Sequence, residues 1–403
     1  MIEREKMKIL YLTISNLRLD SNGMYENLIK SLKKRNHNIT VVIADGSKDL
    51  NRTFRSEECG IDVLRVKVGN NFGVNFFKKG INLLLMESKL KSSINKFLGE
   101  EHYDLILYAT PPVTFANVIK YCKKKYGCSS YLMLKDIFPQ NAIDLELFKE
   151  NGILHRMFLQ KEKKLYEYSD FIGCMSKKNV EYLLDKNKQI DKNKVEIFPN
   201  SDNITDLVKG QYSSIKRELN ISEECLLLVF GGNMGKPQGI GFLIDCIKRM
   251  KGYTNVHFLF VGNGTESEKI KLEACNLVNL TFMERIPQEK YENLIRGCDI
   301  GIISLDKRFT IPNYPSRMLS YMDKAMPILA CTDRNTDVRE LIELEAKCGK
   351  WCYSGSVDDF INCVEFFVEN KHSLKKLGLN GRRYMEENFN IDNCIDILEK
   401  HFK

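Results

Sequence analysis

The chain has 403 residues, of which 43% are hydrophobic and 28% are charged, and its formal net charge is +8. This length predicts two domains, and the composition excludes a disordered chain. No apolar run approaches the roughly 20 residues that a membrane-spanning helix needs. The first residues lack the apolar core and cleavage site of a signal peptide, so we expect a cytoplasmic protein.

Charge is unevenly distributed along the chain. Residues 1–200 carry 34 Lys and Arg against 24 Asp and Glu, a net charge of +10, which leaves −2 for the remainder. This asymmetry favours an anionic partner for the first half, either a membrane surface or nucleic acid. No nucleic-acid motif is visible, so we expect no nucleic-acid partner. The 13 cysteines are scattered without a C-x-x-C pair, which is typical of a reduced compartment and makes a zinc site improbable.

The first half alternates apolar strands with helical periodicity, the pattern of a doubly wound parallel sheet. A loop at Asn22 and Gly23 separates the first strand from a helix over Met24 to Arg35, and its glycine would let a ligand approach the helix start. The G-x-G-x-x-G fingerprint of a dinucleotide fold is missing, which disfavours a dehydrogenase. The predicted strands of this half are 8–15, 38–44, 61–68, 104–109, 130–134, 171–175 and 194–198.

A basic, aromatic segment runs from Asn70 to Gly99. A segment of this kind can lie in a membrane interface, but an ordinary domain helix with a solvated lysine face fits equally well. Phe76, Phe77, Lys78 and Lys79 are the residues whose substitution would separate the two interpretations.

Two polar residues follow strands of the first half. Thr110 comes after the strand 104–109 and Asp136 after the strand 130–134. Ligands of open α/β sheets bind beyond the carboxyl ends of the strands, so both residues are site candidates. A helix cap or a salt-bridge partner is the alternative for Asp136.

The pattern restarts after a polar linker that we place at residues 202–222. Two predicted strands, 226–230 and 257–261, each end in glycine-rich turns, GGNMGKPQG and GNG. Such turns let backbone N–H groups hold a phosphate. The first turn is not a P-loop, since its glycine spacing differs and no Ser or Thr is placed for magnesium. Further strands are predicted at 280–283, 299–304 and 327–331, and helices at 358–369, 373–387 and 392–402.

The stretch from Lys307 to Ala330 predicts a loop, a helix start and a strand, which completes a βαβ unit with the strand before it. Ser316 is expected to cap the helix, whose apolar face holds Met318. A helix N-terminus attracts phosphate, although a capped core helix without a ligand fits equally well. Arg317 and Arg285 are candidates to grip a diphosphate, and a surface position is the alternative for each. No D-x-D pair or H-x-x-x-H spacing occurs, so no metal site is predicted.

These motifs together resemble the GT-B fold glycosyltransferases of the retaining family four. GGNMGKPQGI resembles that family's phosphate loop, FVGNGTE its V-G-x-G loop, FMERIPQEKYENLIRGCDIGIIS its base-binding turn, and PSRMLSYMDKAMPILA its diphosphate helix. In the first half, SNGMYENLIKSLKKRNHNITVVI resembles the acceptor-side glycine loop, LKDIFPQ a D-L-W-P stretch and PPVTFA an S-P-P segment. The branch indicated includes fucosamine transferases of O-antigen and capsule synthesis.

The resemblance implies two Rossmann-like domains that face a cleft: residues 1–200 on the acceptor side, 201–385 binding the donor, and 386–403 packing back on the first domain. It implies a UDP-sugar donor, a polyprenyl-diphosphate-linked saccharide acceptor and a peripheral position on the inner membrane face, without metal or cofactor. Asp136 would lie beside the sugar, and Asn22, Gly23 and Thr110 on the acceptor side. The residues expected at the donor are Gly232, Asn233, Gln238, Gly262, Asn263, Arg285, Ile286, Asn313, Ser316, Arg317, Met318 and Ser320.

The chain departs from the family at several donor positions. Asn233 and Gln238 replace an Arg and a Lys of the phosphate loop, and Pro312 and Ser320 replace two glutamates eight positions apart. Asn313 is the expected substitute at the sugar. Despite these departures, the resemblance implies a retaining, metal-independent transferase of a hexosyl or N-acetylated amino sugar in surface polysaccharide synthesis. The alternatives are an inactive transferase-like subunit that binds a membrane partner, and a nucleotide-sugar 2-epimerase.

Overall fold

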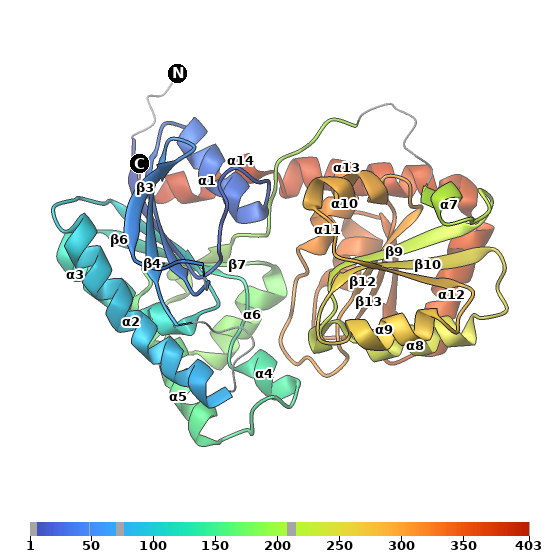
Figure 1. Ribbon diagram of the computed structural model, residues 1–403, viewed down its shortest axis with the longest axis horizontal. Coiled ribbons are helices and arrows are strands. Elements are labelled where there is room, and N and C mark those ends of the chain that lie inside the picture. The colour runs from blue at the N-terminus through green and yellow to red at the C-terminus, as the bar shows by residue number, and fades with distance from the viewer. Residues whose placement is uncertain (1–5, 48, 70–75, 208–214, 403) are drawn as a thin grey trace. The chain divides into compact units, whose positions relative to one another are not determined.

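The computed structural model describes residues 6–47, 49–69, 76–207 and 215–402. The chain divides into two compact units: residues 1–202 together with 391–403, and residues 203–390 (Figure 1). The second unit extends beyond the expected end at 385 because helix α13 (Leu374–Asn388) runs on to Asn388. Helix α14 (Ile391–Glu399) belongs to the first unit.

An eight-stranded sheet forms the centre of the first unit, in the order β3-β4-β2-β1-β5-β6-β7-β8. All neighbours pair in parallel except β3, an antiparallel edge strand. The central strands are short apolar runs buried on both faces, as a parallel sheet requires. The strands are β1 (Lys8–Thr13), β2 (Asn38–Asp45), β3 (Phe54–Glu58), β4 (Ile61–Lys67), β5 (Leu105–Ala109), β6 (Ser129–Leu134), β7 (Phe171–Cys174) and β8 (Val195–Ile197).

Helices cover both faces of this sheet. α1 and α14 share one hydrophobic core with the sheet, and α3 packs against both α2 and α5 (Figure 1). The helices of the first unit besides α14 are α1 (Met24–Lys34), α2 (Phe76–Leu98), α3 (Ala116–Tyr126), α4 (Gln140–Asp144), α5 (Ile153–Tyr168) and α6 (Lys177–Lys186), with 3₁₀ turns at Val113–Phe115, Lys192–Lys194 and Lys400–Phe402.

Charged contacts attach α14 to the end of α1. Arg35 Nη2 lies 2.9 Å from Asp392 Oδ1, and its Nη1 lies 2.5 Å from Asp396 Oδ1. Beside them, His37 Nε2 lies 3.1 Å from Glu399 Oε1 in a buried pair. These contacts join segments more than 350 residues apart in sequence.

A six-stranded, all-parallel sheet forms the second unit, in the order β11-β10-β9-β12-β13-β14. Its strands are β9 (Leu226–Asn233), β10 (Val256–Asn263), β11 (Leu280–Glu284), β12 (Ile300–Ser304), β13 (Ile328–Thr332) and β14 (Gly349–Tyr353). Its helices besides α13 are α7 (Ile215–Glu218), α8 (Ile240–Arg249), α9 (Ser267–Ala274), α10 (Gln288–Ile295), α11 (Arg317–Asp323) and α12 (Val357–Glu369), with a π-helix at Glu340–Glu345 and 3₁₀ turns at Lys236–Gln238 and Lys371–Ser373.

Three sequence expectations need correction. The linker predicted at 202–222 contains helix α7, and Ile215 is buried in it. Ser316 has helical backbone angles and its side chain makes no capping hydrogen bond, so α11 begins at Arg317 without the predicted cap. Strands β3 and β14 were not predicted, because neither is a continuous apolar run: β3 alternates half-buried and exposed residues along a sheet edge.

No helix in the described part of the chain is long and apolar enough to cross a bilayer. The segment predicted at 70–99 contains α2, from Phe76. The side chains of Phe76, Phe77, Lys78 and Lys79 lie outside the described residues.

Candidate functional site

Two glycine turns lie side by side at the carboxyl edge of the second sheet. Gly232 pairs with Gly262 in the register of β9 and β10, and a Cβ on Gly262 would lie 1.9 Å from the carbonyl oxygen of Gly232. Both glycines have positive φ angles, 104° and 155°. Only glycine fits this approach, so the two turns form one backbone layer whose exposed residues include Asn233 and Asn263.

Hydrogen bonds hold this layer together. Met234 N–H donates to the Asn263 carbonyl oxygen at 2.8 Å, and Glu266 N–H donates to the Met234 carbonyl oxygen at 2.9 Å. In the first turn, Gln238 Oε1 accepts from Gly235 N–H at 3.1 Å. The side-chain carbonyl of Gln238 therefore stabilises the turn. The sequence analysis expected Gln238 only at the donor and did not predict this structural role.

Arg317 lies against the same turn. Its guanidinium carbon lies 4.1 Å from the centre of the Phe230 ring, and its Nη2 donates to the Asn233 carbonyl oxygen at 3.4 Å. Among the described residues it forms no ion pair with a carboxylate. Desolvation lowers the pKa of Arg317, with the charges of Tyr321 and Tyr291 acting in the opposite direction, but an arginine remains protonated. The turn thus presents a positive charge beside two glycines with positive φ angles.

Two tyrosines that sequence reasoning missed position the helices around Arg317. A Cβ on Gly231 would lie 1.8 Å from the Tyr291 hydroxyl, and a Cβ on Gly301 would lie 2.3 Å from the Tyr321 ring. Tyr321 O–H also donates to the Val229 carbonyl oxygen at 3.1 Å. Glycines inside strands β9 and β12 were the available signal, because a strand glycine often marks a close approach.

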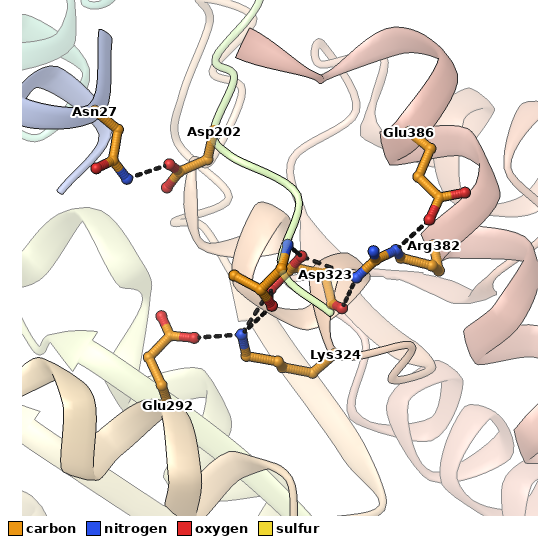
Figure 2. A network of polar contacts seen from close by, with 8 residues as sticks. Asn27, Asp202, Glu292, Asp323, Lys324, Arg382 and Glu386 are labelled. Atoms are coloured by element: carbon orange, nitrogen blue, oxygen red, sulfur yellow. Dashed lines mark hydrogen bonds and ion pairs between the residues drawn. The ribbon is translucent and has the colours of Figure 1, made fainter. Parts of the chain in front are cut away.

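A polar network fixes the opposite end of α11. Figure 2 shows Asp323 and Lys324 between Glu292 of α10 and Arg382 of α13. Lys324 Nζ lies 2.9 Å from Glu292 Oε2, and Arg382 Nη1 lies 3.0 Å from Asp323 Oδ1. Asp323 also accepts from Thr205 N–H at 2.9 Å. These contacts hold the end of α11 that lies opposite Arg317.

The other expected donor residues flank this cluster. Arg285 is exposed and Ile286 half-buried in the turn between β11 and α10. Met318 is fully buried, so only its backbone could meet a ligand. Ser320 is half-buried on α11.

Asn313 has a buried amide nitrogen without a hydrogen-bond partner. Its own carbonyl oxygen accepts from Thr336 Oγ1 at 2.5 Å, which fixes the backbone of this loop. A buried donor left unpaired is unfavourable unless a ligand or water meets it, so the amide is a candidate for a ligand hydroxyl.

In the first unit, Thr110 and Asp136 are brought together at the ends of β5 and β6. Thr110 Oγ1 accepts from Lys135 N–H at 3.1 Å and from Asp136 N–H at 3.2 Å. Desolvation raises the pKa of the Asp136 carboxyl to about 6. Burial, followed by the negative charge of Asp136, raises the pKa of Tyr25 on α1, which places that residue near the carboxylate.

The acceptor-side loop precedes α1 directly. Gly23 is the residue before the helix and has extended backbone angles. Asn22 Oδ1 accepts from Lys30 Nζ at 3.5 Å, a weak contact at an exposed position.

Lys135 is a buried lysine that the sequence analysis did not single out. Its Nζ donates to the carbonyl oxygens of Phe198 at 3.3 Å and Pro199 at 3.2 Å, and it lies 5.2 Å from the centre of the Phe198 ring. Burial lowers its pKa to about 8, because no carboxylate among the described residues offsets the lost hydration.

Within the described ranges, no group of three or more His, Cys, Asp or Glu side chains could hold a metal ion. All 13 cysteines are free thiols.

Comparison with known proteins finds one family model that matches most of the second unit. The sequence model of the family described as Glycosyl transferases group 1 matches residues 211–384. A probable glycosyltransferase, WbjE of Pseudomonas aeruginosa, is 22% identical over 248 residues, which are 60% of this chain and 60% of that protein. The uncharacterized glycosyltransferase MJ1069 of Methanocaldococcus jannaschii is 24% identical over 256 residues, 60% of this chain and 63% of that protein. The matches thus span less than two thirds of both relatives.

Solved structures share the fold over nearly the whole chain. Sucrose-phosphate synthase (tll1590) of Thermosynechococcus elongatus has a TM-score of 0.76 and 14% identity, with 98% of each chain covered. HepE (Alr3699) of Anabaena, in complex with UDP-glucose, has a TM-score of 0.71 and 15% identity, with 98% of this chain and 99% of HepE covered. The predicted fold class, GT-B with two parallel-sheet α/β domains, is confirmed.

Proposed function

We propose that this chain transfers a sugar from a UDP-sugar to a lipid-linked saccharide in the synthesis of a bacterial surface polysaccharide, because residues 211–384 match the model of Glycosyl transferases group 1. The proposed transfer is retaining and needs no metal ion. Within the group we place the chain in family four, near the fucosamine transferases, with an N-acetylated amino or deoxyamino hexose as the donor sugar and a polyprenyl diphosphate as the acceptor's anchor. The motifs of both halves support that placement.

The single observation that carries the donor assignment is Arg317 beside the paired glycine turns. A diphosphate needs backbone N–H donors and a positive charge that no carboxylate already neutralises. The turns at Gly232 and Gly262 bring backbone without side chains to this place, and the guanidinium supplies the charge. UDP-glucose bound to HepE, a protein of the same fold, supports UDP as the nucleotide.

In the proposed reaction, the bond between the sugar's anomeric carbon and the UDP oxygen breaks while the acceptor hydroxyl attacks from the same face. The hydroxyl proton passes to the departing diphosphate. Arg317 stabilises the negative charge that develops on that diphosphate, and preorganised charge of this kind is a large contribution to catalysis. Asn313 offers its unpaired amide to a sugar hydroxyl.

In the first unit we assign the acceptor side to Asn22, Gly23 and Thr110, with Asp136 beside the reacting sugar. The Asp136 carboxyl has a pKa near 6, so it is mostly ionised at neutral pH and can accept a hydrogen bond from a substrate hydroxyl. A lipid-linked acceptor would place the chain at the inner membrane face as a peripheral protein.

A second candidate is a transferase-like subunit without activity. The family's two glutamates are replaced here by Pro312, which is buried, and Ser320, which is half-buried. Neither side chain has a carboxylate that could bind the donor. We rank the inactive subunit second because the glycine turns at Gly232 and Gly262 and the positive charge of Arg317 are both present.

Thermal unfolding with UDP, GDP, CDP and NAD at matched concentrations tests the assignment. A nucleotide at about 100 times its dissociation constant adds about 2.7 kcal/mol to the free energy of unfolding, a shift of several degrees. Selective stabilisation by UDP, absent in Arg317→Ala, supports the transferase and leads to a screen of donor sugars. Absence of any response contradicts it and favours the inactive subunit.

A further inference from the structure

The outer faces of α2, α3 and α5 are predominantly basic. Figure 1 shows these helices in the first unit, and α3 packs against both of the others. Among their described side chains, seven basic residues are exposed and one acidic residue, Glu167, is exposed. The basic residues are Lys89, Lys96, Lys120, Lys124, Arg156, Lys163 and Lys164.

The remaining acids of these helices are withdrawn from the surface. Glu87 of α2 is buried and binds Lys161 Nζ and Asn117 Nδ2, the latter at 2.6 Å. Glu162 of α5 is buried and accepts from Tyr166 O–H at 2.7 Å. The surface is therefore more basic than the composition of the three helices indicates. The turn before α5 is mixed, with Glu146, Lys149 and Glu150 exposed, so the positive charge lies on the helices.

Large apolar side chains project at the start of α5. Ile153 has 88% of its surface exposed, the highest value among the large hydrophobic residues in the described ranges. Leu147, Leu154 and, on α2, Leu85 are exposed as well. Isolated exposed apolar residues are ordinary, but here they occur on and beside the basic helices.

We propose that this surface, which we call the α2–α3–α5 face, docks on an anionic lipid bilayer, with Ile153 and Leu154 entering the interface and the lysines above the headgroups. The proposal deepens the proposed function by naming the surface that would bring the chain to a lipid-linked acceptor. It differs from the interface predicted around Phe76 and Phe77, since it rests on described residues of α3 and α5.

The chemistry of the face favours a bilayer over an acidic protein. Lysines spread over three helices suit a diffuse layer of headgroup charge, and each lysine near such a surface strengthens binding roughly fivefold. Projecting side chains such as Ile153 gain free energy by entering the acyl boundary, whereas a protein partner would need a matching pocket for each.

Co-sedimentation of the full chain with vesicles tests the proposal, without donor or acceptor present. We expect the wild type to bind vesicles of phosphatidylcholine and phosphatidylglycerol, to bind phosphatidylcholine alone at least tenfold more weakly, and to lose binding at high salt. Lys163→Gln with Lys164→Gln should weaken binding roughly 30-fold, and Ile153→Ser with Leu154→Ser roughly tenfold or more.

Matched controls lie in the second unit. Lys375 and Lys376 are neighbouring exposed lysines on α13, and Leu272 and Val278 are exposed apolar residues at α9 and before β11. Lys375→Gln with Lys376→Gln is the control for the lysine variant, and Leu272→Ser with Val278→Ser is the control for the apolar variant. Each should alter vesicle binding less than about twofold, as expected for surface positions outside the interface.

Equal binding of wild type and both α5 variants overturns the proposal. Failure of the wild type to bind anionic vesicles also overturns it and leaves an acidic protein as the occupant of the face. Stabilisation by UDP, measured on the same variants, reports the donor site separately, so vesicle binding without a nucleotide response contradicts only the proposed function.

Discussion

The guanidinium of Arg317 stacks on the ring of Phe230, with 4.1 Å between its central carbon and the ring centre. Phe230 is a fully buried residue of β9, and Arg317 is the first residue of α11. The contact holds a cation over an aromatic face, an interaction of about 0.5–2 kcal/mol. It therefore fixes the charge at the glycine turns before any ligand arrives.

Replacement of Arg317 by Ala should weaken binding of UDP by about 10- to 150-fold, the value of a charge-assisted hydrogen bond of about 1.5–3 kcal/mol. Titration calorimetry measures this. Arg383→Ala, at an exposed position on α13, is the control and should bind UDP as the wild type does. Unchanged affinity in Arg317→Ala would refute the role of the guanidinium.

Replacement of Gly262 by Ala should destabilise the second unit by about 2 kcal/mol or more, because the new Cβ overlaps backbone atoms that cannot move aside. The Cβ would lie 1.9 Å from the Gly232 carbonyl oxygen. Gly252→Ala is the control, since nothing lies within 4 Å of its Cβ. Chemical denaturation should separate the two variants, and equal stability would contradict the close approach of the turns.

Replacement of Asp136 by Asn tests the pKa of about 6. An unfolded aspartate titrates near 3.9, so between about pH 4 and 6 the folded chain binds more protons, and the free energy of unfolding falls as pH rises. The Asn variant lacks this loss and should gain stability relative to the wild type across that window, with the gain retained at neutral pH.

Urea unfolding from pH 4 to 8 measures that difference, with Asp358→Asn at an exposed position of α12 as the control. A constant difference between wild type and Asp136→Asn would show that the carboxyl is not perturbed. If Asp136 also serves the reaction, the more stable variant should have a lower kcat, a combination that a purely structural residue would not produce.

Replacement of Lys135 by Met tests the pKa of about 8. An unfolded lysine titrates near 10.4, so between about pH 8 and 10.4 the unfolded chain binds more protons and the wild type's free energy of unfolding rises with pH. The Met variant should lack this rise. Denaturation at pH 7.5 and 10 measures this change in the free energy of unfolding. Lys120→Met, at an exposed site, is the control. If the free energy of unfolding changed equally with pH in the wild type and in Lys135→Met, the burial of the charge would be contradicted.

Chelation by EDTA should leave sugar transfer unchanged within about twofold, because a fixed guanidinium can meet the charge of the departing diphosphate without a metal ion. The measurement is UDP release with the preferred donor, with and without added magnesium. A loss of turnover that magnesium restores would show that the proposed metal-independent transfer is wrong.

Much of the fold could be predicted because its signals are local. Strands β1, β2, β9 and β10 begin with short apolar runs, and the glycines at the ends of β9 and β10 mark the turns. The predictions failed where a neighbour decides the structure. Strand β3 is polar and forms only by pairing with β4, and Ile215 is helical and buried inside a segment whose composition resembles a linker.

The candidate site, like the fold, was predictable only where local sequence signals decide the structure. The sequence by itself determined that glycine turns, Thr110, Asp136 and Arg317 come at strand or helix ends, since apolar runs and turn residues act over a few positions. Only the tertiary structure decided that Arg317 stacks on Phe230, that Thr110 binds the backbone of Asp136, and that Lys135 is buried against backbone carbonyl oxygens. The physical reason is that orientation, burial and pKa depend on contacts between residues 26 to 87 positions apart, which no local pattern encodes.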